Sequence, residues 1–300
     1  MSGVTRSRIK QLIDAGYVKI DDEIVKPSRL INPGDLISVY FEPRPGPSFE
    51  PEDIPLDIVY EDENVIVIDK PAGIVVHPAH GNWSGTLMNA LLGHNEHLKE
   101  LGKEFRAGIV HRLDKDTSGL LIAAKDEFTL SELGKQFRDR TIERIYVALV
   151  WGQPKKDSGV IEKNLGRSQK DRKIFTVTEE GKPATTSYKT VEKFNLFSML
   201  ELKLGTGRTH QIRVHLSDLG HPVFGDATYG GRNARFGNLT QNERKKCAEY
   251  LEVMKRQALH AKTLKFFHPV KEEHMFFDSS LPGDFHKLME MIRFDDMNEI

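Results

Sequence analysis

The residues best suited to chemistry lie in one stretch, Gly108-Ile-Val-His-Arg-Leu-Asp-Lys-Asp-Thr-Ser-Gly-Leu-Leu-Ile-Ala-Ala-Lys125. Apolar, strand-like flanks hold a loop that presents Arg112 beside Asp114. Because side chains two apart share a face of extended backbone, we expect Val110, Arg112 and Asp114 to point the same way. A nearby cation favours the ionised form of a carboxyl group, which is the form that a nucleophile or base requires. A structural Arg–Asp pair beside a Thr-Ser-Gly turn is the alternative, because such pairs also perturb pKa values.

Two further stretches carry polar side chains on patterned elements. Alternation along Thr141-Ile-Glu-Arg-Ile-Tyr-Val-Ala-Leu-Val150 predicts a strand with Arg144 and Tyr146 on one face, although a half-buried tyrosine without function is common in strands. Gly205-Thr-Gly-Arg-Thr-His-Gln-Ile-Arg-Val-His-Leu-Ser-Asp-Leu-Gly-His-Pro222 predicts glycine turns and then a helix from near Thr209 to Gly220. We expect this helix to bury Ile212, Leu216 and Leu219. Arg213 lies in its first turns and, from the pattern alone, is an ordinary surface arginine.

The stretch His111-Arg-Leu-Asp-Lys-Asp-Thr-Ser-Gly-Leu-Leu121 resembles the signature of the RluA-type pseudouridine synthases, in particular their large-subunit ribosomal RNA branch. The similarity runs from about residue 56 to 290 and includes Arg144-Ile-Tyr-Val-Ala148 and Leu259-His-Ala-Lys-Thr-Leu-Lys-Phe-Phe-His-Pro269. The resemblance implies an α+β fold: a mixed, mostly antiparallel sheet with flanking helices and a central active-site cleft, preceded by a small S4-like α/β module.

The resemblance also implies roles for single residues. Asp114 would be the catalytic nucleophile or base, Tyr146 would stack on the target base and assist proton removal, and Arg213 would pair with Asp114 to keep it ionised and oriented. Residues expected to contact or support the RNA are Arg112, Arg208 and Gln211, with Leu264 as a wall of the pocket. A plain core leucine is compatible with the last role.

The first 44 residues have a separate pattern. Arg6-Ser-Arg-Ile-Lys-Gln-Leu-Ile-Asp-Ala-Gly16 predicts a short amphipathic helix with Ile9, Leu12 and Ile13 on its apolar stripe. A hairpin and a closing strand at Leu36-Ile-Ser-Val-Tyr-Phe41 follow, and this order resembles the S4 RNA-binding module. The candidate RNA contacts are Arg6, Arg8 and Lys10, with a solvated helix face as the alternative. S4 modules usually carry one more helix before this one, so we expect a shortened module, and a true start upstream of Met1 is a hypothesis that the intact mass of the native protein tests.

Residues 45–55 are expected to form a semi-rigid linker, because prolines restrict the backbone and cannot donate to a sheet. Residues 56–300 would then form the catalytic domain, beginning with two strands across an acidic turn and a helix capped by Thr86. A basic segment within this domain is expected to form a loop between strands that clamps RNA phosphates, although a solvated loop is the alternative. Its residues are Lys163, Arg167, Lys170, Arg172 and Lys173.

Composition narrows the class of protein. With 43 Lys and Arg against 44 Asp and Glu, the net charge of -1 gives no bulk signal for nucleic acid, so any RNA surface must be local. The single cysteine, Cys247, suits a reducing compartment, and no apolar run is long enough for a membrane span. We expect a soluble, cytoplasmic, monomeric protein. The scattered histidines lack the spacing of a zinc hydrolase, so no metal site is expected.

Pseudouridine formation breaks the bond between ribose and a ring nitrogen and rejoins the sugar at a ring carbon. The composition and redox state of the nucleotide are unchanged, so no cofactor is expected. One carboxylate suits this reaction better than glycoside hydrolysis, which generally uses two. The expected partner is ribosomal RNA or a ribosomal subunit precursor. The alternative is a catalytically silent assembly factor that binds RNA through its S4-like module.

Overall fold

The computed structural model describes residues 6–40, 50–79, 81–95, 98, 106–171, 174–232 and 239–298. The chain divides into two compact units, Met1–Gly46 and Pro47–Ile300. None of the described helices is long and apolar enough to cross a membrane.

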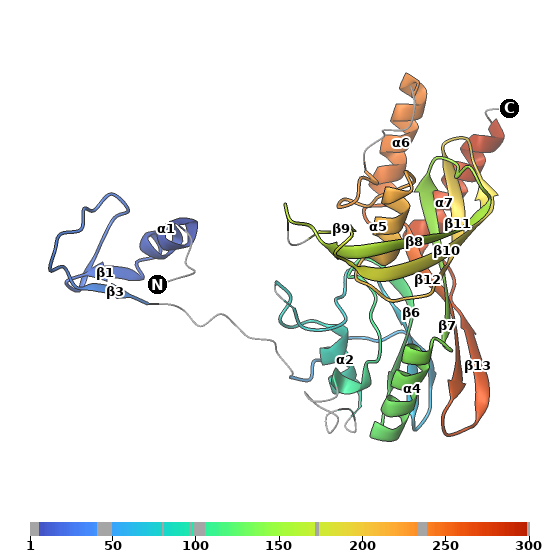
Figure 1. Ribbon diagram of the computed structural model, residues 1–300, viewed down its shortest axis with the longest axis horizontal. Helices are drawn as coiled ribbons and strands as arrows, with labels where there is room; N and C mark the ends of the chain where they lie inside the picture. Colours follow the sequence, from blue (N-terminus) through green and yellow to red (C-terminus); the bar gives the residue numbers. More distant parts are fainter. Residues whose placement is uncertain are drawn as a thin grey trace. The chain divides into compact units, whose positions relative to one another are not determined.

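The smaller unit has the predicted order of helix, hairpin and closing strand (Figure 1). Helix α1 precedes a three-stranded antiparallel sheet of order β2-β1-β3. Leu12, Val18 and Ile20 are buried, whereas Ile9, on the predicted apolar stripe, is 42% exposed. A unit with so short a sheet buries only part of its helix. The elements are α1 (Arg6–Asp14), β1 (Val18–Ile20), β2 (Glu23–Ile24) and β3 (Ile37–Val39).

The larger unit is built on one sheet of ten strands among the described residues, in the order β4-β5-β6-β12-β7-β11-β10-β8-β9, with β13 paired to β12. The pairing of β6 with β12 is parallel and the other pairings are antiparallel, which confirms the predicted fold class. The strands are β4 (Ile58–Glu61), β5 (Val65–Lys70), β6 (Ser118–Ala124), β7 (Glu143–Trp151), β8 (Ser158–Arg167), β9 (Phe175–Val177), β10 (Lys182–Lys193), β11 (Phe197–Leu204), β12 (Leu259–His268) and β13 (Glu273–Asp278).

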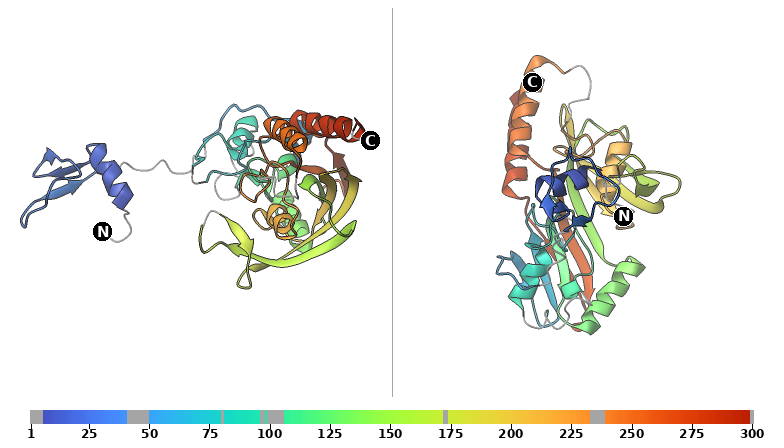
Figure 2. Two further views of the ribbon diagram at one scale, coloured as in Figure 1. Left: turned by 90° about the horizontal axis from the view of Figure 1, so that it is seen from above. Right: turned by 90° about the vertical axis from the view of Figure 1, so that its left-hand side faces the viewer.

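Helices flank this sheet, and the last two of them lie side by side (Figures 1 and 2). Tyr250 of α6 donates a hydrogen bond to Asp295 of α7. Leu219, just after α5, is 38% exposed rather than buried as predicted, because α5 has already ended at Asp218 and the chain turns away at Gly220. The helices are α2 (Leu87–His94), the 3-10 turn η1 (Arg106–Gly108), α4 (Glu127–Asp139), α5 (Gln211–Asp218), α6 (Gln241–Val253) and α7 (Gly283–Asn298).

The second half of the predicted linker packs against α2. Asn89 donates to the carbonyl oxygen of Glu50 at 2.9 Å, and the Glu52 carboxylate accepts from the backbone N–H of Gly85 at 3.0 Å. A Cβ at Gly93 would lie 2.2 Å from the Glu52 carbonyl oxygen, so only glycine allows this close approach. Residues 50–55, the second half of the predicted semi-rigid linker, therefore pack with the larger unit.

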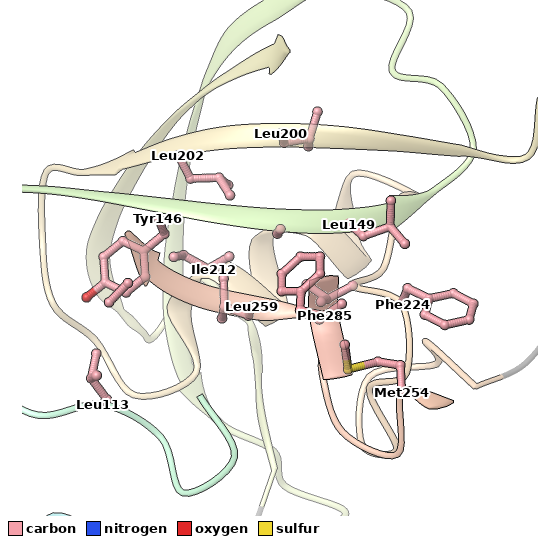
Figure 3. Close-up of a cluster of buried hydrophobic side chains, with 14 of the residues drawn as sticks. Leu113, Tyr146, Leu149, Leu200, Leu202, Ile212, Phe224, Met254, Leu259 and Phe285 are labelled. Atoms are coloured by element: carbon pink, nitrogen blue, oxygen red, sulfur yellow. The ribbon is translucent and has the colours of Figure 1, made fainter. Parts of the chain in front are cut away.

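The main hydrophobic cluster joins the sheet to α2, α5, α6 and α7. Figure 3 shows part of it, with Tyr146 at one end and Phe285 of α7 near its middle. A second cluster includes Leu133 of α4, Val67 of β5 and Phe266 of β12. Apolar side chains of the strands thus pack against the helices. This packing holds the strand ends in place, and with them the loops that follow.

His260 of β12 gives the fold a measurable pH dependence. It is 1% exposed, its ring nitrogens lie 3.0 Å from Ser118 Oγ and 3.1 Å from Ser279 Oγ, and burial lowers its pKa to about 4. The unfolded chain, with an ordinary histidine pKa of 6.5, binds the proton more readily. Stability therefore falls as the pH drops from 6.5 towards 4.

We expect protonation of His260 alone to lower the free energy of unfolding by about 2 kcal/mol between pH 7 and pH 5. Urea unfolding at both pH values measures the loss, and a His260→Gln variant should lose correspondingly less than the wild type. An identical loss in the variant would show that another group is responsible.

Candidate active site

A cleft of about 620 Å³ opens beside Asp114. Its walls come from the loop after η1, from the end of α4 and the start of β7, and from the turn that precedes α5. Six of the predicted site residues line it together: Arg112, Asp114, Tyr146, Arg208, Gln211 and Arg213. Tertiary folding thus gathers three stretches that are far apart in the sequence.

A buried lysine holds the loop that carries Asp114 through hydrogen bonds to backbone carbonyl oxygens. Lys70, at the end of β5, is fully buried and donates to the carbonyl oxygens of Pro71, Ile74 and Lys115 at 2.6, 3.0 and 3.1 Å. Burial lowers the pKa of Lys70 to about 8, although the nearby Asp116 opposes this. Thr117 N–H donates to the Asp114 carbonyl oxygen at 3.1 Å and closes the turn. The carboxylate is therefore presented from a fixed backbone.

Arg213 is the cation that contacts Asp114. Its Nη1 lies 3.0 Å from Asp114 Oδ2, while its Nε and Nη2 donate to Asp226 at 2.6 and 3.0 Å. Burial opposes the charge, but the hydrogen bonds to Asp226 raise the pKa of Arg213 above its usual value. No ion pair joins Arg112 to Asp114 in the described part of the chain, so the prediction that Arg112 is the adjacent guanidinium is wrong. The loop is not a regular strand there, and Arg112 is exposed.

Asp226 and two rings complete the surroundings of Arg213. Asp226 is fully buried and also accepts from the backbone N–H groups of Thr228 and Tyr229 at 2.8 and 3.1 Å. The guanidinium of Arg213 lies 4.9 Å from the centre of the Tyr229 ring, a cation–π arrangement. His210 Nε2 lies 4.0 Å from Asp114 Oδ2. The Asp114 carboxylate thus contacts the Arg213 guanidinium, whose other edge is held by Asp226.

Tyr146 of β7 also lines the cleft and is 4% exposed. Burial raises its pKa, although the neighbouring Arg144 opposes this rise. Its phenol is therefore protonated at neutral pH and can stack and donate a hydrogen bond. Arg144 lies over the Phe137 ring at 5.0 Å, which places its charge on the same side of the cleft.

Gln211 is a support of the cleft. Its Oε1 accepts from Thr206 Oγ1 at 2.7 Å and from the N–H of Arg208 at 3.0 Å, and its amide nitrogen donates to the Thr185 carbonyl oxygen at 2.9 Å. These bonds hold the turn at Gly205 to Arg208. Arg208 donates through Nε to the Pro183 carbonyl oxygen at 3.2 Å and remains exposed.

Leu264 does not line the cleft, so its predicted role as a pocket wall is wrong. It is fully buried in the second cluster, together with Ile142 and Leu133. Ile142 and Leu259 line the cleft instead. The physical reason is that α4 lies over this part of β12, and the cleft opens only beyond it.

The first part of the predicted basic segment is strand, and the loop between strands begins only at Ser168. Lys163 and Arg167 lie on β8 and are exposed, and Lys170 is exposed in the turn that follows. None of the three lines the cleft. Arg172 and Lys173 lie outside the described residues, as do the side chains of Arg6 and Arg8. Lys10 is exposed on α1.

The sequence patterns did not single out Asp226, His210 or Tyr229. The only local signal was an acid in the glycine-rich stretch Gly225-Asp-Ala-Thr-Tyr-Gly230, which resembles any turn. His210 was considered only as one of the scattered histidines, for which no metal site is expected. Their function depends on partners far away in the chain, which no local pattern reveals.

Comparison with known proteins assigns the chain to a family. Residues 64–218 match the family model described as RNA pseudouridylate synthase, and residues 2–37 match that of the S4 domain. An uncharacterized RNA pseudouridine synthase of Chlorobaculum parvum is 47% identical over 299 residues, which cover 98% of this chain and 91% of that protein. Ribosomal large subunit pseudouridine synthase D of Haemophilus influenzae is 42% identical over 292 residues, or 97% of this chain and 88% of that protein.

Solved structures share the fold. Human RNA pseudouridylate synthase domain containing 4 superposes with a TM-score of 0.61 at 23% identity, over 79% of this chain and 92% of that one. Human RNA pseudouridylate synthase domain containing 1 gives a TM-score of 0.57 at 25% identity, over 84% of this chain and 98% of that one. The chain therefore belongs to the RNA pseudouridylate synthase family, carries an S4 domain, and is an isomerase that converts uridine in RNA to pseudouridine.

Proposed function

We propose that this RNA pseudouridine synthase modifies uridines of large-subunit ribosomal RNA and uses Asp114 as its catalytic carboxylate. One observation carries the assignment of the carboxylate: Asp114 is the sole acidic side chain among the described residues that line the cleft. Relatives named as ribosomal large subunit pseudouridine synthase D, from Haemophilus influenzae and Pasteurella multocida, support the choice of RNA.

The reaction assigns a task to each of three side chains. Asp114 attacks the ring or the sugar, or takes a proton from the sugar, so that the nitrogen–carbon bond breaks while the uracil stays in the cleft. Arg213 fixes the direction of the Asp114 carboxylate, since the other edge of its guanidinium is held by Asp226. Tyr146 stacks on the uracil while the ring turns and its carbon joins the sugar. The ring carbon then loses its proton and the freed ring nitrogen gains one.

The uridine must leave the RNA stack to reach Asp114, at a cost of a few kcal/mol. Contacts to phosphates offset this cost. The cleft offers five arginines that form no ion pair with a described carboxylate, namely Arg112, Arg138, Arg140, Arg144 and Arg208. This local excess of positive charge binds RNA even though the chain as a whole carries a net charge of -1.

Mapping pseudouridine in ribosomal RNA tests the substrate. RNA from a deletion strain should lack pseudouridine at specific large-subunit positions, and a plasmid copy of the wild-type gene should restore them. Unchanged large-subunit RNA in the deletion strain would reject this substrate class.

The basic residues of β8 and its turn are proposed to clamp RNA phosphates outside the cleft. Replacing Lys163, Arg167 and Lys170 by Gln should weaken RNA binding and flatten its dependence on salt by about 2 in the slope of log K against log [salt]. Filter binding over a series of salt concentrations measures this slope. Exposed Lys155, Lys156 and Lys189, near the other end of β8, serve as the matched control. Equal slopes for the two triple variants would refute the clamp.

We further propose that the enzyme acts as a monomer in the cytoplasm. Analytical ultracentrifugation with and without RNA tests the first part, and a stable dimer in both conditions would contradict it.

A further inference from the structure

Two hydrogen bonds lead from the Phe175 backbone through Tyr229 to His210, whose ring lies beside Asp114. The backbone N–H of Phe175, on β9, donates to the Tyr229 hydroxyl oxygen at 3.1 Å. That oxygen lies 2.8 Å from His210 Nδ1, and the other ring nitrogen of His210 lies 4.0 Å from Asp114 Oδ2. Both ring nitrogens of His210 therefore face a polar group.

These neighbours decide which nitrogen carries the proton. Because Phe175 N–H occupies one lone pair of the Tyr229 oxygen, the hydroxyl proton can be donated to His210 Nδ1. A bare lone pair on Nε2 would face the negative carboxylate, whereas an N–H there is attracted to it. The neutral ring thus carries its proton on Nε2, directed at Asp114. Burial lowers the pKa of His210, although Asp114 opposes this, so the ring is neutral at pH 7.

The backbone of His210 is also unusual. Its φ of 55° and ψ of 19° lie in the left-handed region, at the residue that caps the N-terminus of α5. This conformation costs a side chain other than glycine about 1 kcal/mol or more, and such residues cluster at functional sites. A local hydrogen bond stabilises this strained backbone, because Val214 N–H donates to the His210 carbonyl oxygen at 2.9 Å.

We propose that His210 is a positioning residue, which holds Asp114 Oδ2 through its Nε2–H during the reaction, and that Tyr229 and the Phe175 backbone fix the proton on that nitrogen. The small movement from 4.0 Å to hydrogen-bond distance accompanies substrate binding. This inference rests on the proposed role of Asp114. It also ties the site to the β8–β9 hairpin, since Leu165 and Phe175 pack with Tyr229 in one small cluster.

Two substitutions separate the bond from the backbone conformation. In His210→Asn the amide takes the place of Nδ1, tolerates the left-handed backbone, and cannot reach Asp114. In His210→Gln the amide takes the place of Nε2. We expect Asn to slow single-turnover tritium release from [5-³H]uridine RNA by about 10- to 100-fold, with RNA affinity within twofold, and Gln to restore most of the rate. Equal rates for Asn and the wild type, or an equal loss for Gln and Asn, would overturn the proposal.

Tyr229→Phe tests the hydroxyl, because Phe keeps a ring beneath Arg213. It should slow turnover in the wild-type background and have no further effect in His210→Asn, since both changes act through the same bond. Additive effects of the two substitutions would show that Tyr229 does not act through His210. The ¹⁵N spectrum of labelled histidine should show His210 as the Nε2–H tautomer, and an Nδ1–H tautomer would overturn the assignment.

Asp114→Asn in the same assay distinguishes failure of this inference from failure of the proposed function. Turnover by Asp114→Asn would reject the role of Asp114 itself. An inactive Asp114→Asn together with a fully active His210→Asn would support the catalytic role of Asp114 and reject only the positioning role of His210.

Discussion

Replacement of Asp114 by Asn is expected to reduce pseudouridine formation by about 10³- to 10⁴-fold while RNA binding changes little. The amide has nearly the same shape as the carboxylate, but it carries no negative charge and is neither a nucleophile nor a base of comparable strength. Single-turnover tritium release measures the rate, and filter binding measures the affinity. The loss falls on the chemical step because the cleft arginines proposed to bind RNA are unchanged.

Tyr146→Phe provides the matched control for this prediction. The phenylalanine ring can still stack on the uracil, and the buried tyrosine has a raised pKa, so its phenol is a poor base at neutral pH. We therefore expect a much smaller loss than for Asp114→Asn. Normal turnover by Asp114→Asn would reject the proposed catalytic carboxylate.

Replacement of Asp226 by Asn is expected to lower the free energy of unfolding by about 3–5 kcal/mol. The change leaves the buried charge of Arg213 without its bidentate partner, in a place where water cannot replace it. Turnover should fall as well, because Arg213 is then free to turn away from Asp114. Urea unfolding at pH 7 measures the stability.

Glu192→Gln is the control, since Arg293 grips Glu192 with the same two-bonded geometry, at 2.9 and 2.7 Å. The side chains of that pair are 50% and 36% exposed, whereas those of Arg213 and Asp226 are 7% and 0% exposed. An exposed pair of this kind contributes about 1 kcal/mol or less. Equal losses for the two variants would show that burial does not set the contribution of the Asp226 pair.

Local pattern was enough to predict many of the elements. The capped helix at Thr86, the strand that carries Tyr146 and the helix that carries Arg213 all follow from hydrophobic periodicity and from caps, which act over a few residues. The errors arose where packing from a distant element decides exposure. Leu264 satisfies the pattern of a strand, but only the position of α4 determines that it is covered and does not face the cleft.

Short motifs in the sequence were enough to identify the family, and through that resemblance they indicated Asp114, Tyr146 and Arg213 as candidate site residues. The pairing of the strands and of the charged side chains, in contrast, became clear only from the three-dimensional fold. Strand β12 lies between β6 and β7, in parallel with β6, and this order is set by long-range packing that no local pattern encodes. It is this folding that brings Arg213, rather than the adjacent Arg112, to Asp114 and places Asp226 and His210 around them.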